Sequence, residues 1–179
     1  MQWMIIGSIM QMFFLDTTII ETCTQFNLRF FTFFQYIEHL TPEVLWQPHL
    51  LEHPNGAQAL AALWFASTNP DETAGRLAPL VEAVPAREAD GDLRIALGRG
   101  AFRVVDEAHW RRLLPRAELP PLPAPVAIEF RVRSLAATHG LLAKAGVLTH
   151  QLPGDLLAVA PQEACGATLL FSETSKGGN

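Results

Sequence analysis

The sequence predicts an α+β fold in which one βαβββ unit occurs twice and the two copies close into a single cupped eight-stranded sheet. The first observation is the order of elements after residue 60, which is an apolar run, a capped helix and three short strands separated by turns. The second is that the same order starts again at residue 126. The third is a proline-rich connector between the copies. Internal repetition of this kind narrows the architecture far more than it narrows the function.

The first copy opens with an apolar strand, 60–65, which we expect to be buried on both faces. The next helix, 70–81, is expected to have Asn69 or Thr68 as its cap, because Pro70 suits the first helical position. The pair Asp90-Gly91 predicts a two-residue hairpin turn. The remaining elements expected in this copy are strands at 84–87, 93–97 and 102–105 and a short, exposed helix at 109–114, in which His109 is a candidate for anion binding.

The connector 115–125 contains five prolines and should be stiff and extended. It leads into strand 126–132, where apolar residues alternate with Glu129, Arg131 and Arg133. One face of this strand should therefore meet a helix, and the other should carry charge toward whatever the sheet encloses. These charged residues could line a cavity for a polar ligand, or they could pair across the sheet with Arg103 or Glu88.

The rest of the second copy begins with a helix over 135–145. Ser134 is the expected cap, and Gly146 is expected to end the helix in a left-handed conformation. Turns at Pro153-Gly154 and Cys165-Gly166 separate the last strands, which are predicted at 149–152, 156–160 and 168–171.

The N-terminal part of the chain differs in composition. Residues 1–28 are rich in Met, Phe, Ile and Thr, whereas the rest is rich in Ala, Leu, Pro and Arg. The apolar stretch 4–15 is shorter than the ~20 residues that span a bilayer, and it lacks the basic region and cleavage site of a signal peptide. We therefore expect an atypical N-terminal segment and no membrane partner. Residues 29–40 are Phe- and Tyr-rich and predict a strand, followed by a turn at 41–43 and a loop at 47–57.

Bulk composition restricts the class of protein. Hydrophobic residues are 49% and charged residues 17%, which is typical of a globular domain. A net charge of −5 argues against a nucleic-acid partner, which would require a basic face. Cys23 and Cys165 are too few for a disulfide framework or a zinc cluster. We expect them to be buried free thiols in a reducing compartment, the cytoplasm.

Four stretches carry a resemblance to a known family. They are Glu38-His39-Leu40-Thr41-Pro42-Glu43, His53-Pro54-Asn55-Gly56-Ala57, Ala145-Gly146-Val147, and residues 161–167 before the final strand. With the paired modules, they make residues 30–173 resemble the glyoxalase-like branch of the vicinal oxygen chelate superfamily. That superfamily includes glyoxalase I, extradiol dioxygenases, fosfomycin-resistance enzymes and bleomycin-binding proteins.

The resemblance implies a domain organisation. Relatives in this branch are longer and have an additional N-terminal domain of the same type, so residues 29–56 resemble the last strand and connector of such a domain, here missing. Residues 57–173 then form the glyoxalase-like domain, with modules at 57–114 and 122–173, between the segment 1–28 and a tail at 174–179. A non-functional truncated product is a further alternative. The strand edge at 29–40 would then favour aggregation or a homodimer.

The resemblance also implies a metal site. Enzymes of the superfamily place four ligands, usually His, Glu or Gln, on the first and last strands of each module, and the divalent ion chelates vicinal oxygens. Strands 60–65 and 102–105 offer no ligand, and the expected histidine of the first copy is absent. The candidate metal ligands are therefore Gln35 and His39, which share one face of strand 29–40, and Glu129 and Glu173 in the second copy.

Two functions follow from these expectations. The first is a metal-dependent lyase, isomerase or dioxygenase that acts on a small oxygen-rich molecule with Fe, Mn, Ni or Zn. The second is a metal-free domain that binds a small-molecule ligand or supports an active site in the missing N-terminal domain. The absent histidine favours the second, and no metal is the expectation for residues 57–173 alone. A structural corner at His39 is the alternative to a ligand role. Nucleophile-elbow, phosphate-loop, dinucleotide and zinc motifs do not occur in the sequence.

Overall fold

The computed structural model describes residues 3–5, 36–38, 47, 51–115 and 117–173. The chain divides into two compact units, residues 1–40 and 41–179. In the first unit, β1 (Trp3–Ile5) pairs antiparallel with β2 (Tyr36–Glu38). Strand β2 falls inside the strand predicted at 29–40. The turn predicted at 41–43 lies outside the described residues.

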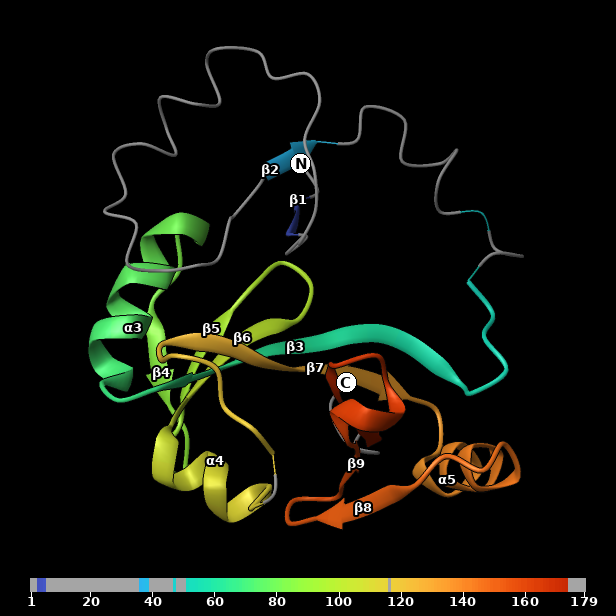
Figure 1. Ribbon diagram of the computed structural model, residues 1–179. Coiled ribbons are helices and arrows are strands. Elements are labelled where there is room, and N and C mark those ends of the chain that lie inside the picture. Colours follow the sequence, from blue (N-terminus) through green and yellow to red (C-terminus); the bar gives the residue numbers. More distant parts are fainter. Residues whose placement is uncertain (1–2, 6–35, 39–46, 48–50, 116, 174–179) are drawn as a thin grey trace, which may run out of the picture. The chain divides into compact units, whose positions relative to one another are not determined.

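The second unit contains a mixed eight-stranded sheet with the strand order β4-β5-β6-β3-β7-β10-β9-β8 (Figure 1). The first module comprises β3 (Ala57–Ser67), α3 (Pro70–Leu77), a 3-10 turn (Ala78–Val81), β4 (Pro85–Arg87), β5 (Leu93–Ala96), β6 (Ala101–Asp106) and α4 (Glu107–Leu113). The second comprises β7 (Ala124–Val132), α5 (Leu135–Lys144), β8 (Thr149–Leu152), β9 (Leu156–Val159), a 3-10 turn (Pro161–Glu163) and β10 (Thr168–Glu173).

The strand pairing explains how the repeat becomes one sheet. Within each module the first strand runs parallel to the last, β3 beside β6 and β7 beside β10. The modules meet where β3 and β7 pair antiparallel, with Leu63 opposite Ile128. The strand order on one side of this central pair therefore repeats on the other. The paired βαβββ fold predicted from the sequence is confirmed.

Different helices and side chains pack against the two faces of the sheet. On the outer face, α3 packs on β5 and β6, and α5 packs on β8 and β10. Phe65 meets Phe102 edge-on there, with ring centroids 5.6 Å apart. On the inner face, Trp64 of β3 lies against Trp110 of α4 at 6.4 Å. Alternation along β3 sends its side chains into both layers, so most of this strand from Ala61 onward is buried, as predicted.

The helix ends follow the capping rules. Asn69 accepts a hydrogen bond from the Glu72 N–H at 3.3 Å, and Ser134 accepts one from the Ala137 N–H at 3.3 Å. Gly146 follows α5 with φ 77°, as predicted. The helix predicted at 70–81 changes to a 3-10 turn after Leu77, because Pro79 has no N–H to continue the α-helical ladder. Among the described residues, no helix is long and apolar enough to cross a membrane.

Three details differ from the sequence-based expectations. The helix α4 is exposed on one side only, because Trp110, at 1% exposure, turns the other side onto the inner face. Leu60 is 47% exposed rather than buried, because the register with β7 shifts between Leu60 and Ala62 and turns this end of β3 outward. Cys165 is exposed, because it occupies a turn at φ 54°; Cys23 lies outside the described residues.

Gly100 belongs to the same irregular corner. Its φ is +81°, and a Cβ added there would lie 2.8 Å from the carbonyl oxygen of Leu60 and 3.0 Å from that of Ala61. Only glycine allows both the left-handed conformation and the close approach of the two backbones. The turn between β5 and β6 therefore sets the floor of the inner face beside β3.

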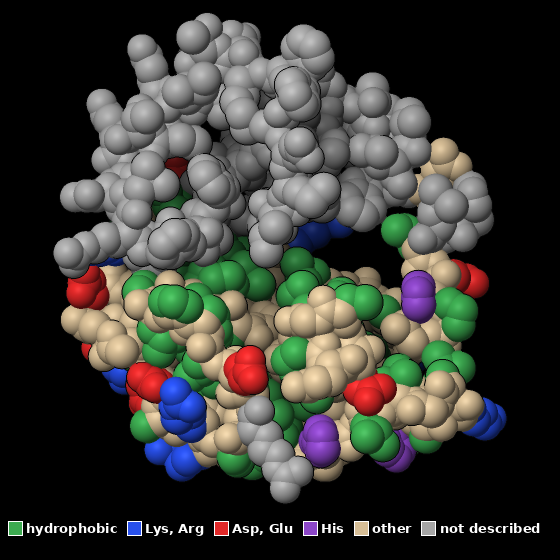
Figure 2. All heavy atoms as spheres, in the orientation of Figure 1, with side chains coloured by type: hydrophobic (Ala, Val, Ile, Leu, Met, Phe, Trp, Pro, Cys, Tyr) green, Lys and Arg blue, Asp and Glu red, His purple; other side chains and the backbone are tan. Residues whose placement is uncertain are grey.

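The surface of this unit is mixed in charge. Acidic and basic side chains are interspersed over the face seen in Figure 2, between hydrophobic and neutral ones. This pattern agrees with the small net charge of the sequence.

Candidate functional site

A cavity of about 360 Å³ lies on the inner face of the sheet, at the junction of the two modules. Its floor is made of small residues, since Ala62 pairs with Ala101 on one side and with Glu129 on the other. These alanines leave space above the sheet where larger side chains would fill it. The charged and polar residues that line the cavity are Glu88, Arg94, Arg103, Glu129, Arg131, Ser172 and Glu173.

Glu129 brings a nearly buried carboxylate to this cavity. Its exposure is 9%, and its Oε2 accepts a hydrogen bond from the indole Nε1–H of Trp64 at 2.8 Å. The indole N–H of a buried tryptophan is stabilised by an acceptor, and the pairing of β3 with β7 brings Glu129 within reach. The other oxygen, Oε1, has no hydrogen-bond partner among the described residues. Glu129 therefore has an acceptor available for a ligand.

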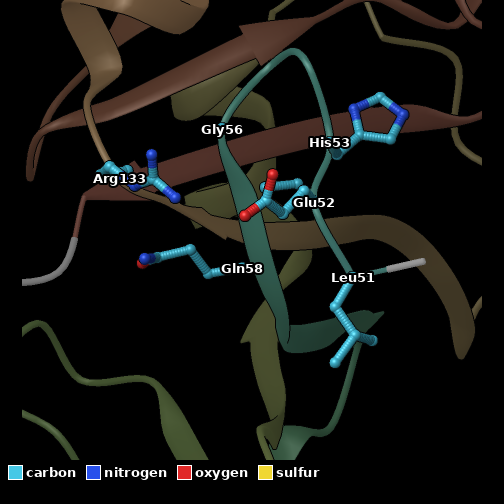
Figure 3. Close-up of a pocket in the computed structure, with 7 residues that line it drawn as sticks. Leu51, Glu52, His53, Gly56, Gln58 and Arg133 are labelled. Atoms are coloured by element: carbon cyan, nitrogen blue, oxygen red, sulfur yellow. The ribbon is translucent and has the colours of Figure 1, made fainter. Parts of the chain in front are cut away.

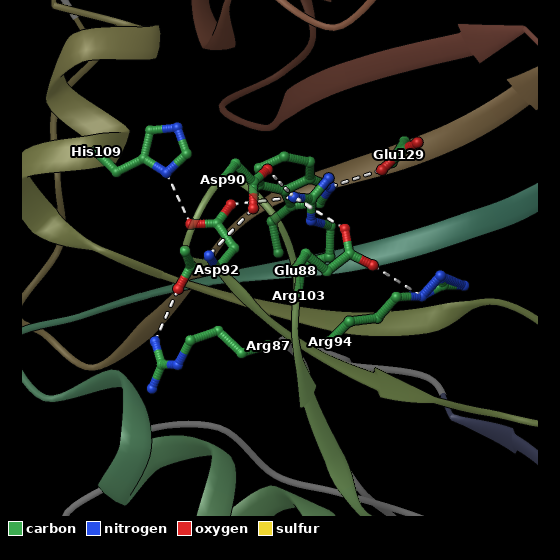
Figure 4. Close-up of polar contacts among 10 residues, drawn as sticks. Arg87, Glu88, Asp90, Asp92, Arg94, Arg103, His109 and Glu129 are labelled. Carbon is green, nitrogen blue, oxygen red and sulfur yellow. Dashed lines mark hydrogen bonds and ion pairs between the residues drawn. The ribbon is translucent and has the colours of Figure 1, made fainter.

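Arg103 occupies the first-module wall of the cavity and is held by neighbours on several sides (Figure 4). Its guanidinium lies over the ring of Trp64, 4.3 Å from the centroid, as in a cation–π contact. Its Nη2 lies near three carboxylates, those of Asp90 at 2.7 Å, Asp92 at 3.1 Å and Glu88 at 3.6 Å. The charge of Arg103 is therefore compensated inside the protein. This side chain joins β6 to the β4–β5 hairpin rather than presenting a free cation.

Asp92 and His109 extend this cluster toward α4. Asp92 is 3% exposed, and its Oδ1 lies 2.7 Å from the Nδ1 of His109. Burial raises the pKa of the Asp92 carboxyl above its ordinary value, although the hydrogen bond to His109 opposes this rise. The pKa of Asp90 is lowered, because desolvation is outweighed by the hydrogen bond from the Asp92 N–H and by the charge of Arg103. His109 therefore ties α4 to the hairpin, instead of binding an external anion.

Arg131 differs from the other arginines of the cavity. It lies two residues beyond Glu129 on the same face of β7, and it pairs in register with Ser172 of β10. Arg94 lies 3.8 Å from Glu88, but Arg131 has no ion-pair or hydrogen-bond partner within the described part of the chain. The positive charge of Arg131 is therefore available to an anion from solution.

The four predicted metal ligands are placed as follows. Glu129 lies in the cavity and is bonded to Trp64. Glu173 borders the same cavity, but its Oε2 accepts the Leu135 N–H at 2.9 Å and so helps to start α5. Gln35 and His39 lie outside the described residues. The structure thus gives the two described carboxylates different contacts and does not join them in one ligand set.

The described lining does not fit a metal ion. The register partners of Glu129 are Ala62 on β3 and Leu170 on β10, and Ala101 follows on β6. None of these side chains has an atom that could coordinate a metal. Throughout the described ranges, no group of three or more His, Cys, Asp and Glu residues is arranged to hold an ion.

A second, smaller hollow of about 290 Å³ lies beside the loop before β3. Figure 3 shows Glu52 and Arg133 directed toward this space and His53 directed away from it. Arg133 had been expected on the same charged face as Glu129 and Arg131, but it lines this second hollow, because it follows the end of β7.

The loop itself is held by a compact set of bonds. Asn55 Oδ1 accepts from the Ala57 N–H at 3.0 Å and lies 2.7 Å from His53 Nδ1. The Asn55 carbonyl accepts from the Thr138 hydroxyl at 2.8 Å. The His-Pro-Asn-Gly stretch therefore fastens the start of β3 to α5, and His53 is exposed.

Some residues of the inner-face site were not predicted from the sequence. Arg94 and Ser172 were not singled out, and Trp64 was assigned to the core alone. The signal available was alternation, since Arg94 and Arg103 each lie between buried apolar residues in a short strand. The close approach of Trp64 to Glu129 joins residues 65 positions apart, which no local pattern predicts.

Comparisons with known proteins address the fold. No family model matches the sequence, and no curated protein matches it either. Solved structures do match, among them methylmalonyl-CoA epimerase from Mycobacterium tuberculosis, with 13% identity and a TM-score of 0.55 over 69% of this chain and 93% of that one. The chain has the vicinal oxygen chelate fold.

Two further matches agree with this vicinal oxygen chelate fold. A hypothetical protein from Bacillus halodurans C-125 has 14% identity and a TM-score of 0.53, over 67% of this chain and 96% of that one. A variant of Streptomyces coelicolor methylmalonyl-CoA epimerase, in complex with 2-nitronate-propionyl-CoA, has 9% identity and a TM-score of 0.53, over 69% and 99%. At such identities, the likeness establishes the fold alone.

Proposed function

We propose that the protein binds a small organic anion in the inner-face cavity and does so without a metal. The observation that carries this proposal is that one strand bordering the cavity bears Arg131, a cation without an acidic partner among the described residues, and Glu129, a nearly buried carboxylate. A volume of about 360 Å³ lies within the range of small-molecule sites, roughly 300–1,000 Å³. Charged and polar groups make up most of the lining above an alanine floor, and such groups fix the orientation of a ligand.

Two observations support the absence of a metal from this role. The strand positions around Glu129 are occupied by alanine and leucine, which cannot coordinate an ion. Trp64 and Arg103 already occupy the space beside the carboxylate. Solved proteins with this fold have been seen with methylmalonyl-CoA and with 2-nitronate-propionyl-CoA, so the fold itself accommodates anionic organic ligands.

Metal content and ligand binding together test this proposal. The full chain is incubated with Mn, Fe, Co, Ni and Zn salts, desalted and analysed for bound metal, with Glu129→Gln as the matched variant. We expect far less than one equivalent of any metal in both proteins. One equivalent that is lost in Glu129→Gln would overturn the metal-free proposal. In parallel, the Trp64 indole N–H resonance is followed while a small-molecule fragment set is added, and we expect binding of anionic fragments.

A second candidate function is a metal-dependent lyase, isomerase or dioxygenase that acts on a small oxygen-rich molecule. The observation that favours it is the likeness of the fold to several methylmalonyl-CoA epimerases. Its ligands would have to include residues such as Gln35 and His39. Stoichiometric metal that is lost on His39→Ala but retained in His53→Ala would select this candidate.

The sequence leads to further proposals. We propose that residues 29–56 are the end of a further glyoxalase-like domain and that residues 57–173 support it. We also propose a cytoplasmic location and a homodimer. The sheet of the second unit ends in β4 and β8, which supports the idea of edge pairing between copies. Light scattering on the full chain would measure the oligomeric state.

A further inference from the structure

We infer that the ligand of the inner-face cavity is a short carboxylate that also carries a hydrogen-bond donor, either a hydroxyl or an ammonium group. Arg131 and Ser172 bind the carboxylate, and Glu129 accepts from the donor. This inference rests on the proposed function and names the class of its ligand.

The charges around the three arginines of the cavity indicate which of them binds the carboxylate of the ligand. Three arginines line the cavity, but Arg103 is surrounded by three carboxylates and Arg94 lies 3.8 Å from Glu88. Only Arg131 has no acidic partner in the described ranges. A guanidinium presents two parallel N–H groups that match a carboxylate, and Ser172, in register beside it, offers a hydroxyl donor.

The donor end is assigned by Glu129. Its Oε2 receives the Trp64 indole, and its Oε1 lacks a donor in the described part of the chain. This oxygen is not among the buried polar atoms that lack a partner, so it is open to the cavity, where it can accept a hydrogen bond from a ligand. A ligand hydroxyl or ammonium group would satisfy it, whereas a second anion would be repelled.

Strand geometry fixes how the two ends are related. Glu129 and Arg131 are two residues apart on one face of β7, so their Cα atoms are separated by roughly 6.6 Å. The alanine floor beside them leaves room for a short carbon chain. A simple carboxylate would leave Glu129 without its donor, and a neutral diol would leave Arg131 without its anion. One molecule with both groups satisfies both residues.

The experiment uses four matched probes on the full chain. They are 3-hydroxybutyrate, butyrate, which lacks the donor, and 1,3-butanediol, which lacks the carboxylate; 3-aminobutyrate supplies the ammonium alternative. Dissociation constants come from the shift of the Trp64 Nε1–H resonance, which reports directly on Glu129. We expect 3-hydroxybutyrate or 3-aminobutyrate to bind at least tenfold more tightly than butyrate, and 1,3-butanediol to bind weakest.

Variants assign the two ends separately. Arg131→Gln should weaken the binding of all three carboxylate probes at least tenfold, while Arg133→Gln, which alters the other hollow, should leave it unchanged. Glu129→Gln should remove the preference over butyrate. An amide spectrum of each variant shows whether it is folded.

The outcomes separate the inference from the proposed function. Butyrate that binds as tightly as both 3-hydroxybutyrate and 3-aminobutyrate, or carboxylate binding that Arg131→Gln leaves unchanged, would overturn the inference. In either case carboxylates still bind, so the proposed function stands and only the ligand class changes. If no carboxylate shifts the Trp64 resonance, whether or not cationic or neutral fragments do, the proposed function fails as well.

Discussion

The two modules of the sheet share one topology but have different interiors. In the first, the inner face carries Arg103 with its three carboxylates, and α3 buries Thr73, Ala74 and Leu77. In the second, β9 is buried at all four positions, and Thr138 is the only buried residue of α5. The first module is thus joined by ion pairs on its inner face, and the second depends on apolar strands beneath a largely exposed helix.

This difference shows that two modules with the same secondary-structure elements need not contain the same binding site. The strand periodicity and the turns recur in both copies, so the backbone recurs. The side chains that face the cavity differ, because the fold requires of them only that they fill space or find partners. In this protein the first module supplies a compensated cluster, and the second supplies the groups that remain available, Glu129 and Arg131.

The largest expected effect comes from comparing the two inner-face arginines. Arg103→Met leaves the buried carboxylate of Asp92 without its arginine partner and should lower the free energy of unfolding by about 3 kcal/mol. Arg131→Met should change it by no more than about 0.5 kcal/mol, because its side chain has no described partner to lose. Urea denaturation of both variants measures the difference. Equal losses would contradict the distinction between a structural and an available arginine.

Glycines in corresponding turns provide the next comparison. Gly100→Ala would add a Cβ at a positive φ, 2.8 and 3.0 Å from two backbone oxygens of β3. It should lower the free energy of unfolding by about 2–3 kcal/mol. Gly166→Ala, before β10, has φ +92° but nothing within 4 Å, and should cost about 1 kcal/mol. Thermal unfolding of the two variants would rank them. A cost for Gly100→Ala that does not exceed that of Gly166→Ala would show that the β3 corner can relax.

The end of α5 tests the stability of the second module. Gly146 has φ +77°, a conformation that a β-branched residue resists, so Gly146→Val should cost about 1–2 kcal/mol. Amide hydrogen exchange should speed up in α5 and β8 more than in α3. An unchanged melting temperature would contradict the role of this residue in ending the helix.

The smallest effect is a pH dependence that belongs to the first module. The folded-state pKa of Asp92 is raised above its ordinary value of 3.8, so its contribution to stability is fully present below 3.8 and is lost as the pH rises through the folded-state value. The free energy of unfolding of wild type minus that of Asp92→Asn should therefore fall as the pH rises from 3.8 through this value. Asp90→Asn should show the opposite slope below pH 3.8, because the folded-state pKa of Asp90 is lowered and its contribution to stability is lost as the pH falls through that value. Urea denaturation on both sides of pH 3.8 measures both.

Much of the fold was predictable because its signals are local. Asn69 and Ser134 cap helices, Asp90-Gly91 forms a hairpin with the Gly91 N–H bonded to the Glu88 carbonyl at 3.0 Å, and Gly146 ends α5. Less of the site was predictable. Glu129 and Arg131 were expected on an enclosed face from alternation alone, but the contacts of Glu173 with α5 and of His109 with Asp92 were not anticipated.

From the sequence alone came the two modules, their order of elements and most of their boundaries, because hydrophobic period, caps and turn residues act within a few positions of one another. Only the tertiary structure decided that β3 and β7 form the central pair, that α4 turns inward on Trp110, and that Trp64 bonds to Glu129. Those contacts join residues far apart in the chain. Their formation depends on the packing of the whole sheet, to which no short stretch of sequence corresponds.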